Sequence, residues 1–239
     1  MRLDAALVER NIYKSRTRAQ RAIEEGSITV NGKVITKPSF SVSEIDDIVS
    51  LGDPLPYVSR GGLKLQGAFD FFKISVNGLK CVDIGASTGG FTEVLLINGA
   101  ESVCAVDVGH SQLDETLLNN PKVINMEKTD FRNMPEDCSG TFDFACSDVS
   151  FISVTLLLPK MYEVLKHGSS AVVLIKPQFE SDTKKVGKNG IVRDEKVRKK
   201  AVSKVSLCAE ACGFTVKGIT ESPVKGGDGN VEYLMWVKK

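Results

Sequence analysis

A short segment between residues 81 and 92 constrains the fold of this 239-residue chain more than any other part of its sequence. It reads Cys81-Val-Asp-Ile-Gly-Ala-Ser-Thr-Gly-Gly-Phe-Thr92, so a β-type run ends in an acid, passes through a glycine-rich turn and enters an amphipathic helix. The glycines let the backbone approach a ligand closely, and the helix start offers unpaired N–H groups. This order of elements predicts an α/β sheet with a nucleotide-type pocket.

The spacing of these glycines differs from the G-x-G-x-x-G pattern of dinucleotide-binding folds. An acid two residues before the first glycine is more typical of pockets that hold the amino-acid part of S-adenosylmethionine. The alternative is a tight strand-to-helix turn that binds no ligand. The candidate cofactor-binding residues of this run are Asp83, Gly85, Ser87, Gly89, Gly90 and Phe91.

Segments with strand and helix character alternate after residue 72, which predicts a parallel sheet with helices on both faces. A closing pair of strands, Phe214–Thr220 and Val231–Val237, predicts an antiparallel hairpin. Class I (Rossmann-like) methyltransferases end in this way, whereas nicotinamide dehydrogenases generally do not. The other predicted strands are Lys80–Ile84, Ser102–Asp107, Val123–Asn125, Phe142–Ser147 and Ser170–Ile175, with helical stretches such as Thr92–Asn98 and Ser153–Leu165 between them.

An acid accompanies each of the first three predicted strands. Asp83 precedes the glycine turn, Asp107 ends the second strand, and Asp130 follows the third. Because such sheets bind ligands at the carboxyl ends of their strands, we expect these side chains to meet there. Asp107 would take the ribose hydroxyls of the cofactor. Asp130 would accept from an adenine amino group, while Phe131 packs near the ring.

Residues 1–51 predict a separate small α+β module, in which two short helices precede a hairpin with an Asn31-Gly32 turn. Five basic residues and no acid lie between Arg10 and Arg21, which indicates either a phosphate-binding footprint or a solvated helix face. Pro54 and Pro56 predict a stiff linker over residues 52–60. The larger domain would then span residues 61–239.

The small module resembles the S4 RNA-binding domain of ribosomal and RNA-modifying proteins. The resemblance rests on Arg2-Leu-Asp4, Ser15-Arg-Thr-Arg-Ala19 and Ile23-x-x-Gly-x-Ile-x-Val-Asn-Gly-Lys33. It implies that basic side chains of the module face RNA phosphates. The predicted RNA-binding residues are Arg2, Lys14, Arg16, Arg18, Arg21, Lys33, Ser59 and Arg60.

The whole chain resembles the haemolysin A (TlyA) family of ribosomal RNA 2′-O-methyltransferases, whose catalytic domain is similar to the FtsJ type. The motifs that carry this resemblance are Val58-Ser-Arg-Gly-Gly-Leu-Lys64, the glycine run, Asp148-Val-Ser-Phe-Ile-Ser153, Ile175-Lys-Pro-Gln-Phe-Glu180, Gly190-Ile-Val-Arg193 and Gly229-Asn-Val-Glu232. The resemblance implies S-adenosylmethionine as cofactor and ribosomal RNA or ribosomal subunits as partners. The implied target is a cytidine ribose of the large subunit, with the small subunit as an alternative. The implied catalytic tetrad is Lys64, Asp148, Lys176 and Glu232.

The chemistry of ribose methylation agrees with these residue types. A ribose hydroxyl is a poor nucleophile until its proton is removed, so a base near neutral pKa is wanted. Free lysine has a pKa of about 10.4, but desolvation and neighbouring cations favour the neutral amine. Lys176 follows an apolar strand and is the expected base, with Asp148 positioning it. Lys64 would steer the hydroxyl, and Glu232 would complete the network.

Composition argues against several other classes of protein. A net charge of +1, 42% hydrophobic residues and no apolar run near 20 residues indicate a cytoplasmic protein without a membrane span. The six cysteines and two histidines show no disulfide-like or metal-ligand spacing, so no metal site is expected. A monomer is favoured.

The sequence leaves open the role of a second basic stretch and two alternative functions of the chain. Nine basic residues between Lys184 and Lys204 indicate a further RNA contact or a solvated helix face. The other functions are a membrane-active cytolysin, as the older family name suggests, and a non-catalytic RNA-binding protein on a methyltransferase fold.

Overall fold

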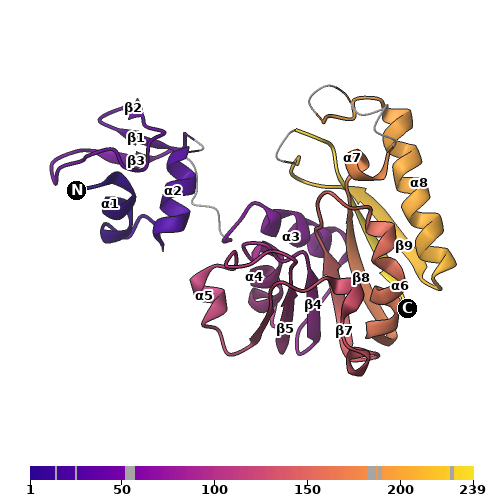
Figure 1. Cartoon of the computed structure of the whole chain (residues 1–239). Coiled ribbons are helices and arrows are strands. Elements are labelled where there is room, and N and C mark those ends of the chain that lie inside the picture. Colours follow the sequence, from indigo (N-terminus) through magenta and orange to yellow (C-terminus); the bar gives the residue numbers. More distant parts are fainter. Residues whose placement is uncertain (14, 25, 52–56, 182–186, 188–189, 227–228) are drawn as a thin grey trace. The chain divides into compact units, whose positions relative to one another are not determined.

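The chain forms two compact units in a computed structural model, Met1–Val58 and Ser59–Lys239, and each unit is described by itself (Figure 1). The structure describes residues 1–13, 15–24, 26–51, 57–181, 187, 190–226 and 229–239. The predicted linker, residues 52–60, stays a prediction because residues 52–56 lie outside the described residues. Lys14 lies outside them as well.

The N-terminal unit packs two helices against a small antiparallel sheet, and their apolar side chains share one core. The turn between the first two strands consists of Asn31 and Gly32, both with positive φ, as a two-residue hairpin requires. The predicted hairpin is therefore confirmed. A third strand, which the sequence did not predict, pairs with the first. The elements are α1 (Leu3–Glu9), α2 (Arg16–Glu24), β1 (Ile28–Val30), β2 (Lys33–Val34) and β3 (Ile48–Ser50).

The C-terminal unit is built on a seven-stranded sheet with the order β6-β5-β4-β7-β8-β10-β9. Strands β4 to β8 pair in parallel, and β10 pairs antiparallel with both β8 and β9. This arrangement confirms the predicted class I methyltransferase sheet with a closing hairpin. The strands are β4 (Lys80–Ile84), β5 (Ser102–Val106), β6 (Val123–Met126), β7 (Phe142–Ser147), β8 (Leu165–Ile175), β9 (Thr215–Glu221) and β10 (Tyr233–Lys238).

Helices cover both faces of this sheet, as the alternation predicts (Figure 1). Successive side chains of a strand point to opposite faces. Phe144 of β7 packs edge-on against Phe69 of α3, whereas its neighbour Ala145 belongs to a core shared with α6 and α8. The helices are α3 (Gly61–Phe72), α4 (Gly90–Ile97), α5 (Glu115–Leu118), α6 (Leu158–Val164), α7 (Pro177–Glu180) and α8 (Glu195–Ala211), and 3₁₀ turns span Phe131–Asn133, Glu136–Cys138 and Val154–Leu156.

Two predicted boundaries around α6 need correction. The predicted helix Ser153–Leu165 is instead a 3₁₀ turn followed by α6, because Pro159 falls in the first turn of α6, where proline favours a helix start. Strand β8 begins at Leu165 rather than at Ser170. No helix within the described parts of the chain is long and apolar enough to span a bilayer.

Candidate active site

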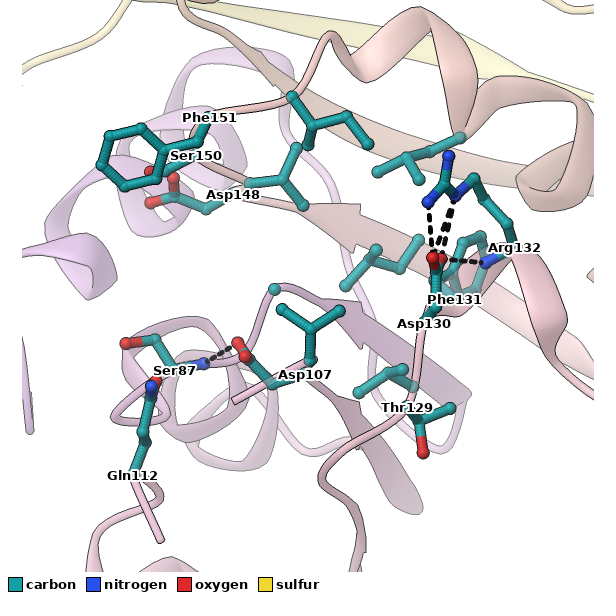
Figure 2. Close-up of a pocket in the computed structure, with 17 residues that line it drawn as sticks. Ser87, Asp107, Gln112, Thr129, Asp130, Phe131, Arg132, Asp148, Ser150 and Phe151 are labelled. Atoms are coloured by element: carbon teal, nitrogen blue, oxygen red, sulfur yellow. Dashed lines mark hydrogen bonds and ion pairs between the residues drawn. The ribbon is translucent and has the colours of Figure 1, made fainter. Parts of the chain in front are cut away.

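A cavity of about 470 Å³ opens at the carboxyl ends of the parallel strands, where sheets of this kind bind ligands (Figure 2). The loop after β4 contributes Gly85 and Ser87 to its lining, and Asp107 follows β5. Asp130 follows β6, and Asp148 follows β7. A cavity of this volume matches the usual size of a small-molecule site.

Asp107 is fixed by two backbone N–H groups at one side of the cavity. Its Oδ2 accepts from the N–H of Ser87 at 2.8 Å (Figure 2). Its Oδ1 accepts from the N–H of Gly109 at 2.7 Å. A carboxylate offers about four lone-pair positions, so acceptor capacity remains for a ligand. The arrangement fits hydroxyl donors such as those of a ribose.

Asp130 lines the cavity with its carboxylate already bound to protein. Its oxygens accept from Nε and Nη2 of Arg132, and Oδ1 also accepts from the backbone N–H of Arg132 (Figure 2). These hydrogen bonds hold the pKa of Asp130 below its usual value. Phe131 forms part of the wall beside it. A ligand amino group would therefore share Asp130 with Arg132.

Of the glycine-run residues, Gly85 lines the cavity, whereas Gly89, Gly90 and Phe91 are absent from its lining. Gly85 has a φ of +82°, and a Cβ there would come within 2.8 Å of the Asp148 carbonyl oxygen, so a larger residue would push two active-site loops apart. Gly89, Gly90 and Phe91 are buried at the start of α4. We infer that these three residues shape the turn and pack the helix.

Asp83 lies deepest of the predicted cofactor residues. It is fully buried, and its Oδ2 accepts a 2.7 Å hydrogen bond from the hydroxyl of Thr92 on α4. Burial raises the pKa of Asp83 to about 7, with a smaller contribution from the negative charge of Asp148, while the Thr92 bond acts in the opposite direction. Asp83 thus ties β4 to α4 beneath the glycine turn.

The four predicted catalytic residues form one continuous chain of ion pairs. Lys64 Nζ lies 2.7 Å from Glu232 Oε2 and 3.5 Å from Asp148 Oδ2. Asp148 Oδ1 in turn lies 2.6 Å from Lys176 Nζ. Lys64, Lys176 and Glu232 are buried, and Asp148 is partly exposed at the edge of the cavity. Buried charges persist when each is paired in this way.

The sheet topology explains why these residues meet. Lys176 directly follows β8, and Asp148 directly follows the neighbouring strand β7. Glu232 directly precedes β10, whose first residue pairs with the last residue of β8. Lys64 lies near the start of α3, which packs on β10. Three strand ends and one helix therefore bring the two acids and two lysines together.

Two residues beside the tetrad were not singled out from the sequence. Ser150 Oγ accepts a 2.8 Å hydrogen bond from Lys176 Nζ. Phe151 lines the cavity (Figure 2), is 93% exposed and has a φ of +65°. The centroid of its ring lies 5.3 Å from that of the Phe179 ring. Both lie in the Asp148–Ser153 motif, which was the only sequence signal for them. A left-handed conformation of a bulky residue is strained and is often found at functional sites.

In the N-terminal unit, the predicted RNA-binding residues Arg2 and Arg16 share one partner. Both guanidinium groups bind the fully buried carboxylate of Asp4, at 2.9 Å and 3.1 Å, and Gln20 donates to the same carboxylate. The Arg2 hydrogen bond, aided by Gln20 and Arg16, holds the pKa of Asp4 far below its usual value. Both arginine side chains are still about half exposed. Asp4 thus holds two cations at the surface of this unit.

The other predicted RNA-binding residues are distributed over both units. Lys33 is exposed at the start of β2, Arg18 and Arg21 are half-buried on α2, and Arg21 donates to the carbonyl of Val58. In the C-terminal unit, Ser59 and the exposed Arg60 directly precede α3. The described part of the second basic stretch lies largely on α8, where Lys199 pairs with Glu195.

Comparison with known proteins agrees with this architecture. Residues 1–49 match the S4 domain family, and residues 57–239 match the FtsJ-like methyltransferase family. YqxC of Bacillus subtilis, which carries an rRNA methyltransferase name, is 44% identical over 98% of this chain and 84% of its own length. The 16S/23S rRNA (cytidine-2′-O)-methyltransferase TlyA of Mycobacterium tuberculosis is 41% identical over 99% of this chain and 89% of its own length.

A solved structure shows the same likeness in three dimensions. A Streptococcus thermophilus protein that bears a hemolysin name is 40% identical and superposes with a TM-score of 0.79, over 100% of this chain and 88% of its own. The fold and the site thus define an FtsJ-like methyltransferase domain that follows an S4 domain. The chain belongs to the haemolysin A (TlyA) family.

Proposed function

We propose that this chain methylates the 2′-hydroxyl of a cytidine ribose in ribosomal RNA, using S-adenosylmethionine, with the large subunit as the first substrate. The observation that carries the proposal is the ion-pair chain from Glu232 through Lys64 and Asp148 to Lys176, at the edge of the cavity. The names of the relatives support the ribosomal RNA and the cytidine ribose.

The cavity residues fit the proposed cofactor. Asp107 would hold the ribose hydroxyls, Phe131 and Val108 would contact the adenine, and the Asp130–Arg132 pair would border it. Gly85 and Ser87 of the loop after β4 line the cavity and would lie beside the cofactor. S-adenosylmethionine, when bound, supplies an electrophilic methyl group on a sulfonium sulfur.

The surroundings of Lys176 suit it to accept the hydroxyl proton. Its Nζ lies 2.6 Å from Asp148 Oδ1 and donates a 2.8 Å hydrogen bond to the hydroxyl of Ser150, so both side chains fix the position of the amine. Once it has lost its own proton, the amine nitrogen has a lone pair that takes the proton of the 2′-hydroxyl. Lys64 would stabilise the negative charge that develops on the oxygen, and Glu232 would hold Lys64 in place.

The aromatic pair of Phe151 and Phe179 would contact the substrate base. An exposed aromatic ring offers a stacking surface to any base, whatever its sequence. Phe151 is almost fully exposed beside Ser150, whose hydroxyl binds Lys176. The base of the target nucleoside would stack there while its ribose faces Lys176. Arg2, Arg16 and the other basic residues of the S4 domain would bind phosphates of the surrounding RNA.

The test is transfer of labelled methyl from S-adenosylmethionine to ribosomal RNA, with isolated large and small subunits assayed separately. The matched variants are Lys176→Met and Lys122→Met, the latter an exposed lysine far from the site in sequence. We expect Lys176→Met to lose at least about 100-fold in kcat, as general-base removal does. We expect Lys122→Met to match the wild type. Label on a base, or no transfer by the wild type to either subunit, would contradict the proposal.

A further inference from the structure

A buried carboxylate outside the tetrad joins the two loops that carry the proposed base and its partners. The side chain of Glu180 is only 1% exposed, at the end of α7. It is absent from the cavity lining, so it does not face the cofactor position. Its hydrogen bonds reach the loop after β7, which begins with Asp148.

Both oxygens of Glu180 are engaged by that loop. Oε2 accepts from the hydroxyl of Ser153 at 2.5 Å, and Oε1 accepts from the backbone N–H of Val154 at 2.7 Å. That N–H belongs to the first residue of the 3₁₀ turn Val154–Leu156, so the carboxylate also caps the turn. Lys204 of α8 adds a contact to Oε2 at 3.3 Å and donates to the Glu180 carbonyl at 3.1 Å.

The loop after β7 is therefore tied to the segment after β8 at both of its ends. At the first end, Asp148 contacts Lys176, and at the second end, Ser153 and Val154 contact Glu180. Ser150 and Phe151 lie between these two anchors and contact Lys176 and Phe179. The strained backbone of Phe151 persists only where the surrounding structure holds it.

We propose that Glu180 is a positioning residue for methyl transfer, which acts by holding Ser150 and Phe151 against Lys176. The inference rests on the proposed function. Loss of the second anchor would free one end of a loop whose residues 149–152 also line the cavity, while Asp107 and the loop after β4 would keep their places and continue to hold the cofactor. A misplacement of about 1 Å at a reacting group costs on the order of 100-fold in rate. The catalytic step should therefore suffer much more than cofactor binding.

The variants are Glu180→Ala, Glu180→Gln and Ser153→Ala. Glu163→Ala is a matched control, because Glu163 also accepts from a serine and a lysine, Ser139 and Lys160, but on the exposed face of α6. The measurements are kcat for methyl transfer to ribosomal subunits and the dissociation constant of S-adenosylhomocysteine by calorimetry.

We expect Glu180→Ala to lower kcat at least about 10-fold with the dissociation constant within about threefold of wild type, as loss of positioning alone predicts. Glu180→Gln keeps an acceptor for the Val154 N–H and should recover much of kcat. The kcat of Ser153→Ala should fall between those of the two Glu180 variants, and the kcat of Glu163→Ala should match that of the wild type.

The outcomes separate the two proposals. A wild type that transfers no methyl to ribosomal RNA contradicts the proposed function. An active wild type whose Glu180→Ala and Ser153→Ala variants keep kcat within about twofold contradicts the positioning role. Equal losses of kcat and cofactor affinity would show a general loss of structure and would also overturn it. If Glu180→Ala does not fold, Glu180→Gln and Ser153→Ala decide by the same comparison.

Discussion

Lys64 and Glu232 are separated by 168 positions in sequence, yet Lys64 Nζ donates a 2.7 Å hydrogen bond to Glu232 Oε2 in a buried setting. The pair joins the first helix of the C-terminal unit to the residue before β10. Removal of Lys64 leaves the buried Glu232 carboxylate without its cation, which costs on the order of 3–5 kcal/mol, whereas removal of Glu232 leaves Lys64 with Asp148 as its remaining partner.

This pair can be tested with a double-mutant cycle. We expect Lys64→Met and Glu232→Gln each to lower stability, and the double variant to recover part of that loss, because it leaves no unpaired charge. Activity should stay low in all three, since both groups belong to the tetrad. Trp236, the single tryptophan, lies in β10 and reports unfolding of this unit by fluorescence. Additive losses of stability in the double variant would argue against a coupled pair.

Substitution of Asp107 should weaken cofactor binding selectively. Asp107→Ala removes charged acceptors that would each contribute about 1.5–3 kcal/mol, so we expect S-adenosylhomocysteine affinity to fall about 10- to 100-fold. Asp70→Ala, at an exposed acid of α3, is the control and should leave the affinity unchanged. Calorimetric titration measures both. An Asp107→Ala variant with wild-type affinity would remove this carboxylate from the cofactor site.

Phe151, which also lines the cavity, should matter more for RNA than for the cofactor. Base–aromatic stacking contributes about 1–3 kcal/mol per base, so Phe151→Ala should raise the KM for ribosomal subunits about 5- to 150-fold. Phe71→Ala removes another exposed phenylalanine, at the end of α3, and should have little effect. Unchanged kinetics of Phe151→Ala at limiting subunit concentrations would exclude a stacking role.

Asp4 should link RNA binding to stability at acid pH. Its carboxylate has a pKa held below the usual value, so it contributes stability above the unfolded-state pKa near 3.9, and that stability is lost as pH falls through the folded-state value. Asp4→Asn should therefore lower thermal stability at pH 7, with a difference from wild type that shrinks toward pH 3. It should also weaken RNA binding, because Arg2 and Arg16 lose their anchor.

Calorimetry and RNA titrations at several salt concentrations measure these effects. Arg2→Gln should reduce the slope of log affinity against log salt by about one, as loss of a phosphate contact does. Lys217→Gln, an exposed lysine of β9, is the control. A slope for Arg2→Gln equal to that of Lys217→Gln would exclude a phosphate contact.

Asp83 should make the C-terminal unit less stable as pH rises. Its pKa is about 7 when folded and about 3.9 when unfolded, so between these values only the folded state holds the proton. Stability from this group is then full below pH 4 and declines as pH rises through 7. Asp83→Asn cannot ionise and should lack this decline.

The wild-type stability relative to Asp83→Asn should fall by roughly 2–3 kcal/mol between pH 5 and pH 8, at about 1.4 kcal/mol per pH unit below 7. Urea unfolding followed by Trp236 fluorescence measures the difference. A difference that stays constant over this range would mean that Asp83 is ionised throughout.

The sequence predicted the sheet well because its strands are short apolar runs bounded by clear turns. The bounds of β4 and β7 agree with the structure residue for residue, and the closing hairpin is present. Strand β3 was missed because three residues, Ile48–Ser50, carry too little pattern to distinguish them from a loop. The start of β8 was placed late because Lys166, His167 and Gly168 interrupt its apolar run.

The candidate site was predictable only where topology decides the position. Asp107 and Lys176 lie at the edge of the sheet where ligands bind, because each directly follows a parallel strand and the carboxyl ends of these strands share that edge. The burial of Asp83 and the Asp130–Arg132 pairing depend on side-chain geometry, and one sequence carries no signal for it. The same holds for Glu180, whose partners lie 26 and 27 positions away.

The position of β10 between β8 and β9 has a consequence for the nascent chain. The N-terminal unit ends at Val58, whereas the residue that pairs with Lys64 is Glu232. During synthesis, the S4 domain of the growing polypeptide would be exposed to the surrounding RNA before β10 is available to pair with β8. Lys64 acquires its Glu232 partner only when the segment that leads into β10 emerges from the ribosome. On our proposal, the newborn protein would therefore hold RNA before it is able to modify it.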